Sequence, residues 1–178
     1  MFPSVPGARL RPAVLLALLA ALLAAPLAVA AQGAAPPRFG AGFDVTGAFP
    51  GQNLVPEGVA VGVRVRAALP VNADLSVAAD LGLLANLFEG SSDARYVLNP
   101  QTSVIVTLPG RDAVRYVIGG IGGFLPLDGA GGGPTLHLGL GTAIPLRDTS
   151  LYLEFDPSLL VGQNETTVVL AGRVGVIF

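Results

Sequence analysis

The sequence predicts an all-β protein, an eight-stranded antiparallel up-and-down transmembrane β-barrel that follows a cleavable signal peptide. Three observations predict this fold. From residue 39 onward, hydrophobic residues alternate with small or polar residues with a period of two. The alternating segments are about ten residues long, as membrane-crossing strands are, whereas strands of soluble domains average about five or six. The connections between the segments are short and long in turn.

The composition limits the function classes. Charged residues make up 12% of the 178 residues and hydrophobic residues 52%, whereas a soluble domain carries roughly 25% charge. All ten basic residues are arginine and the net charge is −2, so the chain has no basic field for nucleic acid and we expect no such partner. The absence of cysteine excludes disulfides, thiolate metal sites and thiol catalysis.

The first thirty residues have the pattern of a secretory signal. Arg9 and Arg11 precede an unbroken apolar run, Pro26 ends that run, and small residues at 28–30 fit a signal-peptidase site. An uncleaved membrane helix is the alternative, because the apolar stretch is about long enough to span a bilayer. Pro26 and the cleavage site favour a Sec-type signal peptide over residues 1–30, a short linker over 31–37 and a barrel over 38–178.

Eight segments of the remaining chain alternate. Apolar residues take every second position, with Gly, Arg, Asp, Glu or His between them. The fourth segment is weaker because Ile105 falls on its polar side. The predicted strands are centred on residues 39–49, 59–69, 75–83, 101–108, 114–118, 136–140, 151–155 and 168–178.

The connections also alternate. Three short ones begin at Pro70, Pro109 and Pro145, and each contains an aspartate; proline ends a strand because it cannot donate to the ladder. Longer connections rich in Gly, Pro and polar residues are expected near 50–58, 86–100, 122–134 and 157–165. Short turns at one end and long loops at the other are typical of a bacterial outer-membrane barrel.

With these features the chain resembles the small eight-stranded outer-membrane barrels of the OmpA/OmpX type over residues 38–178. The final segment alternates and ends in Phe178. The resemblance implies that Phe178 is read by the outer-membrane assembly machinery, that the other contacts are with outer-membrane lipid, and that the protein resides in the outer membrane. The chain departs from the family in having no Trp and few aromatic residues for the usual interfacial belts.

The polar positions of the strands are expected to face the lumen, because a charge on the lipid face is costly. By counting from the turns, Asp44 falls opposite Arg64, Asp80 opposite Arg64 or Arg66, and Glu154 can meet Arg173. Asp156 is expected at a strand end. The predicted lumenal charge network is Asp44, Arg64, Arg66, Asp80, Arg115, His137, Glu154 and Arg173.

The network has two interpretations. Eight strands leave an interior that side chains can fill, so the charges can form a salt-bridged plug. Alternatively they line a narrow porin-like channel or a small-molecule transporter. A secreted lipocalin-like binding barrel, with apolar side chains inside, is a third reading; it would show a Trp near its first strand and a more charged exterior.

A catalytic interpretation depends on His137, the only histidine. The nearest acids are expected to be Glu154 and Asp156, and no serine is clearly placed beside the ring, so a hydrogen-bonded interior histidine is favoured over a Ser–His–acid site. One histidine with scattered carboxylates has no metal-ligand spacing. We therefore expect no cofactor, no catalysis, and a structural or cell-surface role, with an extracellular ligand at the long loops.

Overall fold

The computed structural model contains eight β-strands of 12 to 14 residues. Within the part of the chain that it describes, no helix is long and apolar enough to cross a bilayer. The described residues are 36–50, 58–86, 95–110, 113–127, 132–162 and 166–178. The strands are β1 (Arg38–Pro50), β2 (Gly58–Pro70), β3 (Leu75–Asn86), β4 (Arg95–Leu108), β5 (Val114–Pro126), β6 (Gly133–Pro145), β7 (Ser150–Val161) and β8 (Thr166–Ile177).

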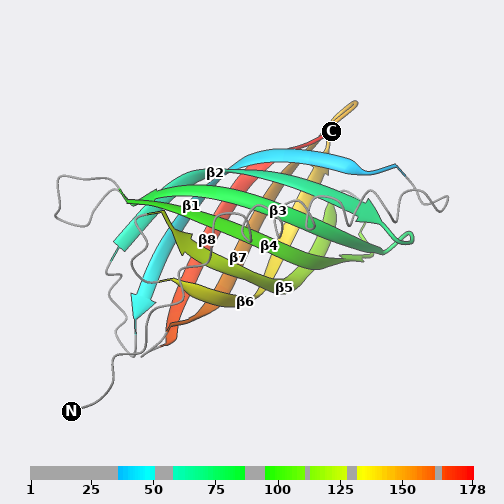
Figure 1. Ribbon diagram of the computed structural model, residues 1–178. Coiled ribbons are helices and arrows are strands. Elements are labelled where there is room, and N and C mark those ends of the chain that lie inside the picture. The colour runs from blue at the N-terminus through cyan, green and yellow to red at the C-terminus, as the bar shows by residue number, and fades with distance from the viewer. Residues whose placement is uncertain (1–35, 51–57, 87–94, 111–112, 128–131, 163–165) are drawn as a thin grey trace, which may run out of the picture.

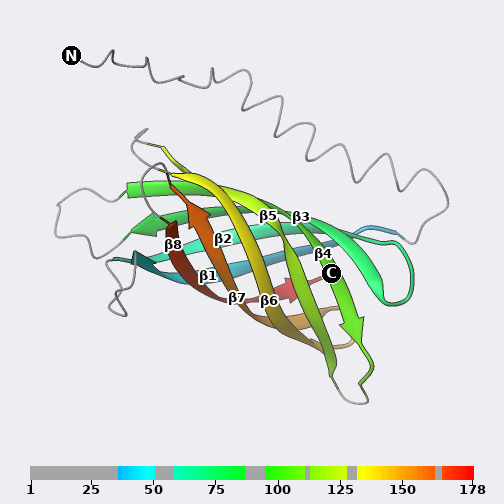
Figure 2. The same cartoon turned by 90° about the horizontal axis from the view of Figure 1, so that it is seen from below.

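The strands form one closed antiparallel barrel. Each strand pairs with the next in the chain, and β1 pairs with β8. Figures 1 and 2 show the strands inclined around a single wall. At the end of the short connections, Phe39 N–H donates to the Phe178 carbonyl (3.0 Å) and Phe178 N–H to the Phe39 carbonyl (2.8 Å), so the two termini of the barrel complete the wall together. The predicted eight-stranded antiparallel up-and-down barrel is confirmed.

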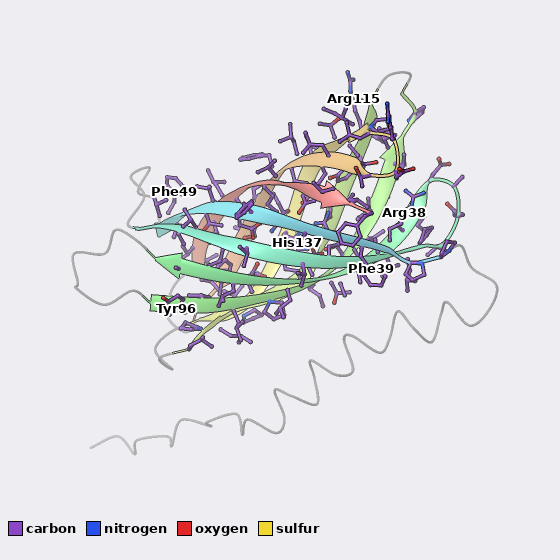
Figure 3. All side chains as sticks on the ribbon, turned by 90° about the horizontal axis from the view of Figure 1, so that it is seen from above. Arg38, Phe39, Phe49, Tyr96, Arg115 and His137 are labelled. Carbon is purple, nitrogen blue, oxygen red and sulfur yellow. The ribbon has the colours of Figure 1, made fainter. Side chains whose placement is uncertain are left out.

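Large apolar side chains cover the outer wall. Ile121 and Leu138 are each 66% exposed and Phe43 is 65% exposed, whereas Arg64, Asp80 and the other interior charges are 5% exposed or less. Figure 3 places Arg38, Phe39 and Arg115 at the short-turn end, Phe49 and Tyr96 at the other end and His137 between them. A lipocalin-like barrel would have the opposite arrangement, so that alternative is wrong.

Local sequence explains the short turns. In the turn after β2, the Asn72 side-chain oxygen accepts the backbone N–H groups of Asp74 (2.9 Å) and Leu75 (2.8 Å), which is an Asx-type turn. In the turn after β6, Leu146 N–H donates to the Thr149 carbonyl at 2.8 Å.

Glycines make room for the two interior tyrosines. Tyr116 lies opposite Gly141, where an added Cβ would lie 2.3 Å from the Tyr116 ring. Tyr152 lies opposite Gly175, where an added Cβ would lie 2.6 Å from the Tyr152 ring. Both rings are thus folded down over a neighbouring strand rather than projecting along the lumen.

Several strands extend further than predicted. Residues 95–100 belong to β4, 122–126 to β5 and 157–161 to β7, all of which were predicted to be loop. Within β4, Pro100 lacks an N–H, and Asn99 and Pro100 have no register partner on β5. The Asn99 amide instead donates to the Gly123 carbonyl of β5 at 2.9 Å, which keeps the two strands joined across the interruption.

The remaining parts of the predicted loops lie outside the described residues, namely 51–57, 87–94, 128–131 and 163–165. The predicted signal peptide, 1–30, lies outside them as well.

Candidate functional site

A group of polar side chains, here called the interior network, crosses the middle of the barrel. Every member is 5% exposed or less. It contains three arginines and four carboxylates, together with uncharged polar groups that complete their hydrogen bonds. The members are Asp44, Arg64, Arg66, Asp80, Asn99, Gln101, Ser103, Tyr116, His137, Glu154, Asp156 and Arg173.

Arg64 on β2 binds groups from β1 and β4. Its Nε donates to Asp44 Oδ2 at 2.8 Å, its Nη1 to Gln101 Oε1 at 3.1 Å and its Nη2 to Asn99 Oδ1 at 2.5 Å. Gly82, opposite Arg64 on β3, leaves the guanidinium its space, because an added Cβ would lie 3.0 Å from Nη2. The Arg64 guanidinium therefore has three oxygen acceptors in place of water.

Arg66 joins two carboxylates from different sides of the barrel. Its Nε donates to Asp80 Oδ1 on β3 at 2.7 Å. Its Nη1 and Nη2 donate to Glu154 Oε1 and Oε2 on β7, the second at 3.0 Å, in the bidentate geometry that favours Arg–carboxylate pairing. Tyr116 OH also donates to Glu154 Oε1 at 2.8 Å, and the Arg66 guanidinium lies 5.4 Å from the centre of the Tyr152 ring.

Arg173 on β8 extends the interior network to the opposite side of the lumen. Its Nη1 lies 2.6 Å from Asp156 Oδ2, and its Nη2 donates to Gln101 Oε1 at 3.0 Å. Because β4 and β8 are four strands apart in either direction around the wall, the Gln101–Arg173 bond runs across the full width of the lumen. Gln101 accepts from Arg64 as well, so it connects the two halves of the network.

Three further members form a linear array. Ser103 Oγ lies 3.2 Å from His137 Nε2, and His137 Nδ1 lies 3.0 Å from Asp156 Oδ1. Gly120 of β5 lies between Ser103 and His137 in register, and its lack of a side chain lets the two reach each other across β5. The sequence placed no serine beside His137, and the structure corrects this: the residue is Ser103.

The array has the connectivity of a Ser–His–Asp triad without an approach for a substrate. Ser103 is 1% exposed, His137 2% and Asp156 0%. Asp156 is also engaged by Arg173, which ties the array into the interior network. Within the described ranges, no group of His and acidic side chains is arranged to hold a metal ion.

The two ends of the lumen differ. Toward the long-loop end, Ala60, Leu84 and Val97 form an apolar cluster with Phe124 against it. At the short-turn end a cavity of about 90 Å³ lies below Arg66 and Tyr116. It has room for only a few waters, each of which occupies roughly 30 Å³ in the liquid.

The structure places seven of the eight predicted network residues in the interior. Asp80 is the register partner of Arg66, and Glu154 is the partner of Arg173, as the counting predicted. Asp44 is paired with Gly62, two positions from the predicted partner, but its side chain still reaches Arg64.

Arg115 is the exception, because it faces outward. In β5 the large buried side chains are Tyr116 and Ile118, both predicted to face lipid, whereas Arg115 is exposed. Tyr116 must face inward to reach Glu154. Because side chains alternate along a strand, its neighbour Arg115 must then face outward.

Sequence reasoning also missed the uncharged members of the network. Asn99 lies in a stretch predicted as loop, and Gln101 and Ser103 are uncharged, so a search for lumenal charges does not find them. The alternation of Val97, Asn99, Gln101 and Ser103 marks the inward face of β4, but Pro100 obscures it.

Comparison with known proteins supports the architecture. No family model matches the sequence, and no curated protein matches it. Neisserial surface protein A superposes with a TM-score of 0.63 at 16% identity, over 82% of this chain and 99% of that one. Ail, the attachment invasion locus protein of Yersinia pestis, superposes with a TM-score of 0.51 at 12% identity, over 80% and 97%. Ail in complex with the heparin analogue sucrose octasulfate gives the same values.

At these identities the likeness shows the fold alone, a closed eight-stranded barrel, which is the fold that the resemblance to the OmpA/OmpX-type barrels implied.

Proposed function

We propose that the protein is an outer-membrane β-barrel with a structural or surface-interaction role, and that the interior network closes its lumen. The observation that carries this proposal is the division between an apolar outer wall and an interior in which each arginine of the network lies beside a carboxylate. In a bilayer every backbone polar group must find a partner within the protein, and a closed barrel provides this. Each strand has 12 to 14 residues, above the roughly 9–11 that a crossing requires.

Cell fractionation tests the location. We expect recovery from the outer-membrane fraction only with detergent, and an unheated sample that migrates differently from a boiled one on a gel, because the folded barrel resists the detergent until it is heated. Recovery as a soluble periplasmic or secreted protein would contradict the proposal.

The closed lumen is supported by bonds that cross it. Gln101 on β4 reaches Arg173 on β8, and Arg66 on β2 reaches Glu154 on β7. We expect no steady conductance when the protein is reconstituted in planar bilayers. Steady conductance of the unmodified protein would favour the channel alternative.

A double variant makes the conductance test specific. Arg66→Ala with Glu154→Ala removes both members of a cross-lumen pair and also takes the Arg66 guanidinium away from Asp80, and we expect the variant to conduct. The exposed turn pair Arg147→Ala with Asp148→Ala is the control and should remain closed.

The surface-interaction role is assigned to the long-loop end. Ail was solved with a polyanion, a heparin analogue. The four long connections of this chain and Arg95 beside them contain five acids and one arginine, so like-charge repulsion disfavours a polyanion here. We expect sucrose octasulfate to give no binding heat in a calorimetric titration; saturable binding would contradict this charge argument.

A further inference from the structure

A groove crosses the outer wall of the barrel over β5 to β8 and β1. It has a volume of about 790 Å³ and is shallow and largely open to the exterior. Its sides are apolar and open to the exterior. They are formed by Phe43, Val45, Leu140, Leu153, Phe155 and Val174.

The strand register explains why the groove runs across the strands. Thr142, Leu153 and Val174 are successive cross-strand partners, so they form one row over β6, β7 and β8. Beside this row is Gly172, whose added Cβ would meet no atom within 4 Å. The missing side chain at Gly172 leaves the floor of the groove open between Phe155 and Val45.

Arg115 lies at one end of this row. Its cross-strand partners are Leu108 on β4 and Thr142 on β6, which carry no charge. It is near the short-turn end of the barrel (Figure 3), which in outer-membrane barrels is the periplasmic end. An arginine at this depth can reach the headgroup layer while its aliphatic part stays along the apolar wall.

These features together match a phospholipid. The apolar groove suits an acyl chain, and the guanidinium suits a phosphate, which arginine binds through paired hydrogen bonds. The headgroups within reach of Arg115 belong to the periplasmic leaflet, and basic side chains near a membrane surface favour anionic lipids. We propose that this groove is a binding site for an anionic phospholipid of the periplasmic leaflet, with Arg115 at the headgroup. The inference rests on the proposed membrane location.

Tryptophan fluorescence tests the site, since the chain has no Trp of its own. Leu153→Trp places a single fluorophore in the groove, and Leu83→Trp on β3 places the control on the opposite wall. Leu153 and Leu83 are 45% and 40% exposed on the outer surface. The full-length variants are reconstituted in phosphatidylcholine bilayers and quenched with brominated phosphatidylglycerol or brominated phosphatidylcholine.

We expect the Leu153→Trp site to prefer phosphatidylglycerol by about fivefold in relative association constant, the effect of roughly one basic residue near the membrane surface. The Leu83→Trp site should show no preference. Adding Arg115→Gln should abolish the preference, and adding Gly172→Leu should reduce quenching by both lipids because leucine fills the floor. Arg147→Gln, an exposed arginine outside the groove, should leave the preference intact.

The outcomes separate this inference from the proposed function. Equal quenching by both lipids at both sites supports the membrane location and overturns the lipid site. If neither tryptophan is quenched although the gel mobility shows that the barrel is folded, the membrane location itself is overturned. A preference for phosphatidylglycerol that survives Arg115→Gln also overturns the lipid site. So does cross-linking that shows a second copy of the chain covering the groove.

Discussion

At the scale of single residues, Glu154 holds the network together most tightly. It accepts hydrogen bonds from Arg66, Arg173 and Tyr116. Glu154→Gln keeps the size of the side chain and removes its charge, so Arg66 keeps Asp80 as its carboxylate partner and Arg173 keeps Asp156. We expect the free energy of unfolding to fall by about 1.5–3 kcal/mol, the usual contribution of hydrogen bonds to a charged group. Urea unfolding in lipid vesicles measures the change; Asp148→Asn, in an exposed turn, should change it by less than about 0.5 kcal/mol. Equal effects of the two variants would show that the Glu154 contacts add little.

The Ser103–His137–Asp156 array leads to a second prediction at this scale. Because all three side chains are buried and Asp156 is shared with Arg173, we expect a structural role. A fluorophosphonate probe should not label the folded protein. Ser103→Ala should instead lower the free energy of unfolding by about 1–3 kcal/mol, because it leaves a buried nitrogen of His137 without its partner. Labelling that disappears in Ser103→Ala would contradict the structural role and indicate a catalytic serine.

At the scale of elements, β5 shows where sequence reasoning fails. Val117 and Ile118 are both apolar, and glycines occupy four of the next five positions, so alternation does not define the inward face. The interpretation therefore depended on Arg115, which was assumed to avoid lipid. That assumption fails near the membrane–water interface, where an arginine on the lipid-facing side of a barrel costs only about 0–1 kcal/mol. In β2 and β7, by contrast, charges and apolar residues alternate over many positions, and the predicted faces are correct.

The contact between β5 and β6 carries the next prediction. Gly141→Ala puts a methyl group where the Tyr116 ring lies, at 2.3 Å. We expect destabilisation of about 1–3 kcal/mol from overpacking. The cost should largely disappear when Tyr116→Ala removes the ring, which a double-mutant cycle measures. Gly172→Ala is the control and should be nearly neutral, since its added methyl group meets nothing. An undiminished cost in the Tyr116→Ala background would mean that the glycine is needed for its backbone alone.

At the scale of the whole molecule, the number of strands, their order and most of the lumenal charges could be predicted from the sequence. Period-two alternation and turn prolines are local signals that can be read from the sequence. Eight consecutive hairpin-linked strands have two unpaired edges, and closing the sheet into a barrel pairs these edges with each other. The contacts across the lumen could not be predicted, because they depend on how far each strand is displaced along the next. The Gln101–Arg173 bond joins residues 72 positions apart, and no local pattern indicates it.

Phe178 provides the prediction that concerns the assembly of the whole barrel. In the folded protein its backbone pairs with Phe39, but its side chain is 64% exposed. Phe178→Ala keeps the backbone bonds and removes only a side chain on the exterior, so its effect on unfolding should be small and similar to that of Phe39→Ala. Phe39 is the matched control, because it lies at the same end, bonds the same backbone and is 48% exposed. If Phe178 is the residue read by the assembly machinery, Phe178→Ala should lower the amount of folded protein in the outer membrane severalfold, whereas Phe39→Ala should not. The amount of heat-modifiable protein in outer-membrane fractions measures assembly in the cell, and spontaneous refolding of both variants in detergent measures their intrinsic ability to fold. Comparing the two separates recognition of Phe178 by the machinery from an effect on stability. Equal levels of the two variants in the membrane would assign Phe178 a role only in closing the wall.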